Sequence, residues 1–191
     1  MTKETLRQLV YDLLLQYRHG ASAPELWRRP VVRFTDASHP QIARLREIVH
    51  PEHHLTTDFM AAPTVIPVYF LPFSIEVINS NRGGYYASEL WTHAYSHSAN
   101  AVKAIDDGLV RVIQESGYLA VKPTGTSYVT PTTYKSRWSH RHIACLFRRH
   151  GHLRYEQPFA DRQRLLRLPL IRRHRPSPFP GQDAAGGAVP V

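Results

Sequence analysis

Cysteine is the scarcest reactive residue in this 191-residue sequence, which contains Cys145 alone. A single thiol excludes a disulfide within the chain, and it cannot supply the four thiolates of an all-cysteine zinc site or a 4Fe–4S cluster. The sequence also lacks a charged-then-apolar leader and an apolar run long enough to cross a bilayer. We therefore expect a cytoplasmic protein with no membrane partner.

The positive charge is unevenly distributed. Residues 145–191 carry nine arginines, no lysine and three acidic residues, so +6 of the formal net charge of +9 lies in them. The whole chain is 42% hydrophobic and 10% aromatic, which is enough for a globular core. We expect a folded domain over residues 1–144, followed by a disordered basic tail over residues 145–191 that is rich in arginine and proline.

Hydrophobic periodicity indicates alternating helices and strands. The expected elements are a helix over 3–19, an extended segment over 31–34, a helix over 40–49, an apolar run over 64–70 with a strand at 68–71, a helix over 87–113, a strand over 118–121, a loop over 123–135 and a helix from 138. Pro67 predicts an edge position or a bulge for its strand, and Gly117 predicts a left-handed helix cap. The fold class is α/β, with α+β as the alternative, and a mixed sheet is flanked by helices.

The densest group of reactive side chains is Trp138-Ser139-His140-Arg141-His142. Two imidazoles, a guanidinium and an indole at the start of a helix can hold an anion, donate protons or stack on a planar ring. His140 and Arg141 are the candidate catalytic residues. In the alternative interpretation Ser139 caps a helix, Trp138 belongs to the core and the charged side chains are solvated.

A second candidate site precedes the long predicted helix. It consists of Asn81, Arg82, Gly83, Gly84, Tyr85 and Tyr86. Glycines without a Cβ let backbone amides approach a phosphate at a helix N-terminus, and the arginine adds charge. The spacing matches neither a P-loop nor a dinucleotide-binding motif, and an ordinary loop-to-helix turn is the alternative.

Two further pairs lie on the long predicted helix. His93 and His97 are one turn apart and could share a metal ion, although no third ligand is evident, and an exposed pair is the alternative. Asp106 and Asp107 are expected on a solvated face.

Several of these segments together resemble the epoxyqueuosine reductase-like iron–sulfur oxidoreductases. The resemblance spans roughly residues 5–144 and is most specific in the sequence WSHRHIA at 138–144. The other similar segments are Leu26–Pro40, Ile48–His54, Val65–Phe73 with its YFxPF motif, and Asn81–Ala101.

This resemblance implies a cobalamin-binding domain similar to that of reductive dehalogenases, joined in the intact family to a domain with two 4Fe–4S clusters. An electron donor protein and a modified base in tRNA, or another small substrate, would be the partners. Membership of such a family does not by itself fix the substrate. The implied cofactor-binding residues are Asn81, Arg82, Gly83, Gly84, Tyr85, Trp138, Ser139 and His142, and no residue is assigned to a metal.

The resemblance stops after Ala144, where the family continues with a glycine-rich loop and cysteines. Back-translation of residues 145–167, read from the second base, can encode Gly-Thr-Phe-Gly and then Gly-Cys-Cys-Gly. We therefore expect residues 145–191 to be an out-of-frame product of a single-base insertion or deletion near codon 145. A genuine divergent tail is the alternative.

On this basis the chain is expected to be an incomplete oxidoreductase that is inactive alone, because the cluster-binding part is missing. Two other functions are consistent with the sequence. A basic RNA-binding module, for example for tRNA, would use the net charge and the aromatic-basic group near Trp138. A non-catalytic corrinoid-binding protein would retain the cofactor without electron transfer.

Overall fold

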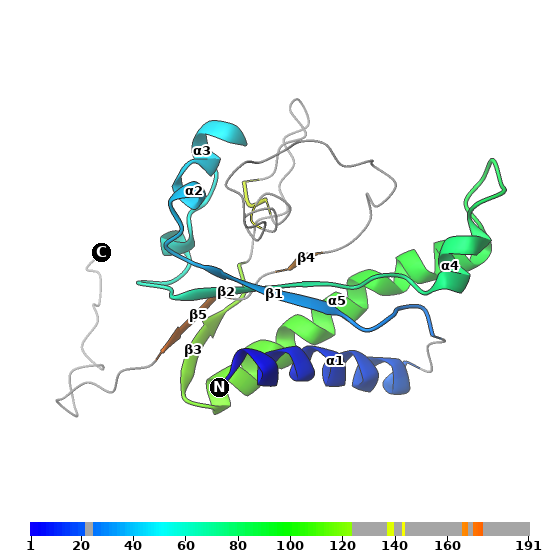
Figure 1. Ribbon diagram of the computed structural model, residues 1–191, viewed down its shortest axis with the longest axis horizontal. Helices are drawn as coiled ribbons and strands as arrows, with labels where there is room; N and C mark the ends of the chain where they lie inside the picture. The colour runs from blue at the N-terminus through cyan, green and yellow to red at the C-terminus, as the bar shows by residue number, and fades with distance from the viewer. Residues whose placement is uncertain (22–24, 124–136, 140–142, 144–165, 168–169, 174–191) are drawn as a thin grey trace, which may run out of the picture.

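The computed structural model describes residues 1–21, 25–123, 137–139, 143, 166–167 and 170–173 (Figure 1). Its helices are α1 (Lys3–Gly20), α2 (Pro40–Ala43), α3 (Leu45–Ile48), the 3-10 turn η1 (Thr56–Asp58), α4 (Ile75–Ser80) and α5 (Glu89–Glu115). Its strands are β1 (Val31–Asp36), β2 (Val65–Phe70), β3 (Tyr118–Val121), β4 (Leu166–Arg167) and β5 (Leu170–Arg173).

The strands form one sheet in the order β1-β2-β5-β3, and β4 also pairs with β2. Each of these pairings is antiparallel. The prediction of a mixed helix-and-strand domain is confirmed. The expected mixed sheet is wrong for the described strands, whose antiparallel ladders correspond to the α+β alternative. No helix in the described part of the chain has the length and apolar character needed to cross a membrane.

The prediction of a disordered tail is wrong for the six tail residues that the structure describes. Val65 lies opposite Ile171, and Tyr69 lies opposite Arg167, so β5 and β4 both pair with β2. On its other side β5 pairs with all of β3. Local periodicity could not reveal this strand, because the position between β2 and β3 is defined by residues distant in sequence.

One face of the sheet is covered by α1 and α5, which run side by side along it (Figure 1). Thr2 caps α1 by accepting a hydrogen bond from Thr5 N–H, and Ser88 caps α5 in the same way. Gly108 permits close helix packing, because a Cβ there would lie 2.4 Å from Leu13 Cδ2. We call the buried residues of this face the helix-side core; they include Leu6, Val10, Leu14, Val32, Tyr69, Ile105, Leu109, Ile113, Ala120 and Ile171.

The opposite face is covered by α2, α3 and the segment that contains Trp138 and Ile143. We call its buried residues the loop-side core; they are Ala37, Ile42, Leu45, Val49, Ile66, Val68, Trp138 and Ile143. β2 supplies both cores, since Ile66 and Val68 point to the loop side and Tyr69 to the helix side.

Three local predictions need correction. The helix expected over 40–49 is two short helices interrupted at Arg44. Pro67 lies in a strand with neighbours on both sides rather than at an edge, and it lies opposite Phe34 in a continuous register with β1 rather than in a bulge. A strand residue directs its N–H to one neighbour only, so the proline removes a single donor. Asp106 is fully buried and accepts a hydrogen bond of 2.6 Å from the Tyr69 hydroxyl, whereas Asp107 is solvated as expected.

Candidate functional site

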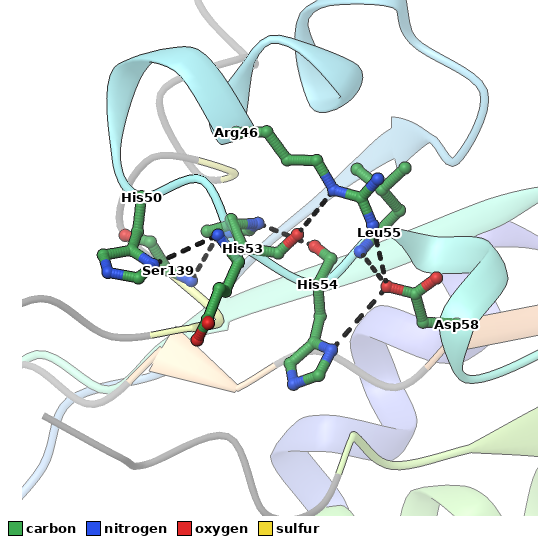
Figure 2. Close-up of polar contacts among 8 residues, drawn as sticks. Arg46, His50, His53, His54, Leu55, Asp58 and Ser139 are labelled. Carbon is green, nitrogen blue, oxygen red and sulfur yellow. Dashed lines mark hydrogen bonds and ion pairs between the residues drawn. The ribbon is translucent and has the colours of Figure 1, made fainter. Parts of the chain in front are cut away.

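The most extensive polar contacts near a predicted site join the turn at residues 50–54 to the segment 137–139 (Figure 2). His54 N–H donates to the Arg137 carbonyl at 2.7 Å. Ser139 N–H donates to His53 Nε2 at 2.9 Å. An ion pair of 2.5 Å between Arg137 and Glu52 lies beside these two bonds. Two segments distant in the sequence are therefore held together by these polar contacts.

His53 has a defined tautomer in this arrangement. Its side chain is fully buried, and its Nδ1 lies 2.6 Å from the carbonyl oxygen of His54. A carbonyl oxygen can only accept, so Nδ1 carries the hydrogen. The Ser139 N–H can only donate, so Nε2 is the unprotonated nitrogen. The contacts of His53 thus require a neutral imidazole with both ring nitrogens hydrogen-bonded.

Trp138 lies in the loop-side core, with 1% of its surface exposed. Its ring stacks on His53 with centroids 5.9 Å apart, and Phe59 meets it edge-on at 5.1 Å. This is the placement that the structural interpretation of Trp138 predicts. A ring so enclosed cannot present a face to a planar cofactor in this conformation.

Ser139 begins a helical turn, since its carbonyl accepts a hydrogen bond of 3.2 Å from Ile143 N–H. The helix start predicted at this position is consistent with that bond. The candidate catalytic residues His140 and Arg141, and the candidate cofactor ligand His142, lie outside the described residues.

The charged side chains of Arg46 and Asp58 contact the turn (Figure 2). Arg46 Nε donates to the His53 carbonyl at 3.0 Å, and its Nη2 lies 3.5 Å from Asp58 Oδ2. The same carboxylate oxygen accepts from Leu55 N–H at 2.8 Å and lies 3.6 Å from His54 Nδ1. Asp58 therefore links α3, the turn and η1 through one oxygen atom.

The second predicted site, residues 81–86, is an exposed loop between α4 and α5. Asn81 is the C-cap of α4, and its side-chain oxygen accepts from Ser88 N–H at 2.9 Å. Arg82 is exposed, and Tyr85 and Tyr86 are 96% and 83% exposed, with their rings edge-to-face at 5.1 Å.

The backbone of this loop fits the phosphate prediction only in part. A Cβ on Gly83 would meet nothing within 4 Å, so packing does not require glycine there, whereas a Cβ on Gly84 would lie 3.0 Å from the Tyr86 carbonyl oxygen. The helix begins at Glu89, after the loop, with Ser88 as its cap. An acidic first turn opposes anion binding at that helix terminus.

The two predicted sites occupy different parts of the fold. Trp138 packs on the loop side of the sheet, whereas the loop at 81–86 joins two helices whose buried residues belong to the helix-side core. In Figure 1 that loop projects at the end of α4 and α5, away from α2 and α3. One pocket shared by all the predicted cofactor residues is therefore not formed in the described part of the chain.

His93 and His97 do lie together on α5, with ring centroids 4.4 Å apart. Nδ1 of His97 is 3.2 Å from the Tyr17 hydroxyl, and burial raises the pKa of that phenol above its usual value. Among the residues that the structure describes, no three histidine, cysteine or acidic side chains gather in a metal-binding arrangement. The contact of His97 with Tyr17 connects α5 to α1.

The chain's residues do not fit an iron–sulfur cluster, because four thiolates are needed and the sequence has one cysteine. For a corrinoid, the exposed predicted residues are Arg82, Gly83, Gly84 and Tyr85, which offer charge, accessible backbone and a stacking face.

Sequence reasoning does not single out His53. The sequence feature that could have indicated it is the histidine-rich segment at 50–54, which carries part of the resemblance. The residues of that segment do not reveal that it is hydrogen-bonded to the segment at 137–139.

Comparisons with protein-family models, with curated proteins and with solved structures found no match to this chain.

Proposed function

We propose that this chain is the N-terminal part of a cobalamin-dependent oxidoreductase resembling the epoxyqueuosine reductases. It would retain corrinoid binding and would be inactive alone, because its single cysteine cannot hold the clusters that deliver electrons. Residues 145–191 would be the out-of-frame continuation. Catalytic roles for His140 and Arg141 belong to this proposal.

One observation supports the proposal most directly. Ile48–His54 and 138–144 both carry the resemblance, and they are hydrogen-bonded to each other through His53 and Ser139. Segments that form one site in a family fold are expected to lie in contact. Their contact favours a single structural unit as the origin of both similarities.

The strands formed by residues 166–167 and 170–173 are compatible with an out-of-frame tail. Antiparallel pairing uses backbone groups that every residue except proline supplies in full. Among the described tail residues, Ile171 has a buried side chain. A sequence that arose by chance can easily contain one apolar residue at such a position. Sequencing the coding DNA tests the point: the second reading frame should contain the glycine-rich and cysteine-rich continuation, and its absence refutes the frame shift.

Corrinoid retention tests the function. The full chain is incubated with hydroxocobalamin and desalted, and the absorbance of the protein fraction is recorded. We expect retained corrinoid, weakened by Arg82→Ala and unchanged by Arg111→Ala, which removes an exposed arginine from α5. A wild-type protein that retains no corrinoid refutes both catalytic and carrier versions of the proposal.

A second candidate, RNA binding, is favoured by the nearly complete exposure of Tyr85 and Tyr86 beside Arg82. Exposed aromatic rings next to a cation are typical of surfaces that stack on unpaired bases. Each lost stacking contact weakens binding by about tenfold, on a scale of roughly 1–3 kcal/mol per base. Fluorescence anisotropy with labelled tRNA should show this loss for Tyr85→Ala and not for Tyr95→Ala, a half-exposed tyrosine on α5. Equal affinities would remove this candidate.

A further inference from the structure

We propose that His53 is a proton-operated latch: its neutral imidazole holds residues 137–139 against the 50–54 turn, and protonation releases them. The latch is built from two directional bonds. Nδ1–H donates to the His54 carbonyl and Nε2 accepts from Ser139 N–H, with the ring fully buried between them.

Protonation turns one of these attractive contacts into a repulsive one. A hydrogen on Nε2 would point at the Ser139 N–H, so that a donor faces a donor, while the Nδ1 bond is kept. The imidazolium would also be a charge in a buried position, stacked on Trp138. Both effects favour a state in which Ser139 has moved away and the charged ring reaches water.

The neighbouring charges of the described residues do not remove this effect. On the turn side, Asp58 is held by Arg46 and by His54. On the segment side, Glu52 is paired with Arg137. Both carboxylates are thus already engaged with cations, and the guanidinium of Arg46, which donates to the backbone carbonyl of His53, opposes a positive ring.

The rings of the other two histidines of the turn have polar partners within residues 50–58. His54 Nδ1 lies 3.6 Å from Asp58 Oδ2. His50 Nδ1 accepts from Glu52 N–H at 3.1 Å, a bond within the turn. Release of 137–139 in acid is therefore a property of His53.

The test follows Trp138 in the full chain. The protein is labelled with 5-fluorotryptophan, which gives one ¹⁹F signal for each of its three tryptophans. Between about pH 8 and about pH 5, the interval in which histidine changes charge, the Trp138 signal should shift to that of a solvent-exposed indole. The signal of the buried Trp27 should not move over the same interval.

His53→Gln places an amide oxygen near the position of Nε2, which can accept from Ser139 but cannot titrate. We expect this variant to keep Trp138 buried throughout the interval, whereas His54→Gln should leave the transition in place. A transition that persists in His53→Gln, or that disappears in His54→Gln, overturns the proposal.

A wild-type measurement covers the case in which His53→Gln does not fold. Imidazole ¹⁵N NMR should show His53 as the Nδ1–H tautomer at neutral pH and protonated in the acid state. Amide exchange at Ser139, corrected for its intrinsic pH dependence, should accelerate about tenfold when the hydrogen bond is lost. A His53 that remains neutral while Trp138 becomes exposed, or that is protonated without faster Ser139 exchange, contradicts the latch.

Discussion

The two faces of the sheet are held by different means. On the helix side, two long helices bury a periodic series of aliphatic side chains against the strands. On the loop side, two single-turn helices and a separate segment cover the sheet, and His53 and Trp138 join them. The first face depends mainly on area and packing, which are non-directional, although Tyr69 also donates a buried hydrogen bond to Asp106 there. On the second face a smaller aliphatic core is supplemented by the directional contacts of His53 with Trp138 and Ser139.

Matched leucine truncations give the largest contrast. Leu109→Ala on the helix side and Leu45→Ala on the loop side delete the same atoms from fully buried positions. Both should lower the free energy of unfolding by about 2–5 kcal/mol. Leu109 should lie at the upper end, since long packed helices cannot collapse into the cavity, whereas the short α3 can shift. Urea denaturation measures both values, and a larger loss for Leu45 would contradict the comparison.

Loss of a buried hydrogen bond should lower the free energy of unfolding by less than a leucine truncation does. The loss should again be larger on the helix side than on the loop side. Tyr69→Phe removes the hydroxyl that donates to the buried Asp106 carboxylate, which should cost about 1.5–3 kcal/mol because one partner is charged. Thr56→Val removes a neutral bond of 3.1 Å to the Ala37 carbonyl and should cost about 1 kcal/mol. Tyr118→Phe, whose hydroxyl accepts from the N-terminal amine at the surface, is the control and should be nearly neutral. Thermal unfolding at one pH ranks the three variants, and a loss for Thr56→Val equal to that for Tyr69→Phe would argue against the order.

The smallest expected effect is at the surface of the helix side. Hydrogen bonds from Lys122 and Lys103 lower the pKa of Asp107 below its usual value. A carboxylate with a depressed folded-state pKa stabilises the protein above its unfolded pKa, and this contribution disappears as pH falls through the folded value. The unfolding free energies of wild type and Asp107→Asn should therefore differ at neutral pH and converge in acid. The difference should stay below about 1 kcal/mol, because the carboxylate is about half exposed. A difference in unfolding free energy that grows as pH falls would contradict a stabilising role for the Asp107 carboxylate.

Sequence reasoning succeeds where the pattern is local. The predicted bounds of α1 and β3 agree with the structure almost to the residue, and Gly117 has the positive φ of 79° expected of a left-handed cap. The period of the long helix identifies α5, although the predicted start lies two residues early, before the Ser88 cap. These features depend on neighbours within a few turns of the same element.

The features that the sequence does not predict depend on distant partners. Asp106 is expected in solvent because nothing in its own helix shows that Tyr69 lies opposite. The role of His53 requires Ser139, 86 residues away. Part of the loop-side candidate site, His140 to His142, stays a sequence prediction, since those residues lie outside the described ones.

The strand at Leu170–Arg173 has a consequence for synthesis of the chain. Thr64, just before β2, bonds through its side chain to the Ile171 carbonyl, 107 residues later. While the ribosome translates that interval, α1, α5 and the β1–β2 pair can already assemble. The edges of β2 and β3 that face β5 in the complete fold stay unpaired until β5 is made. Unpaired strand edges invite pairing with other nascent chains, so slow translation or crowded polysomes should increase aggregation of this protein, and a chaperone that shields exposed strands should relieve it.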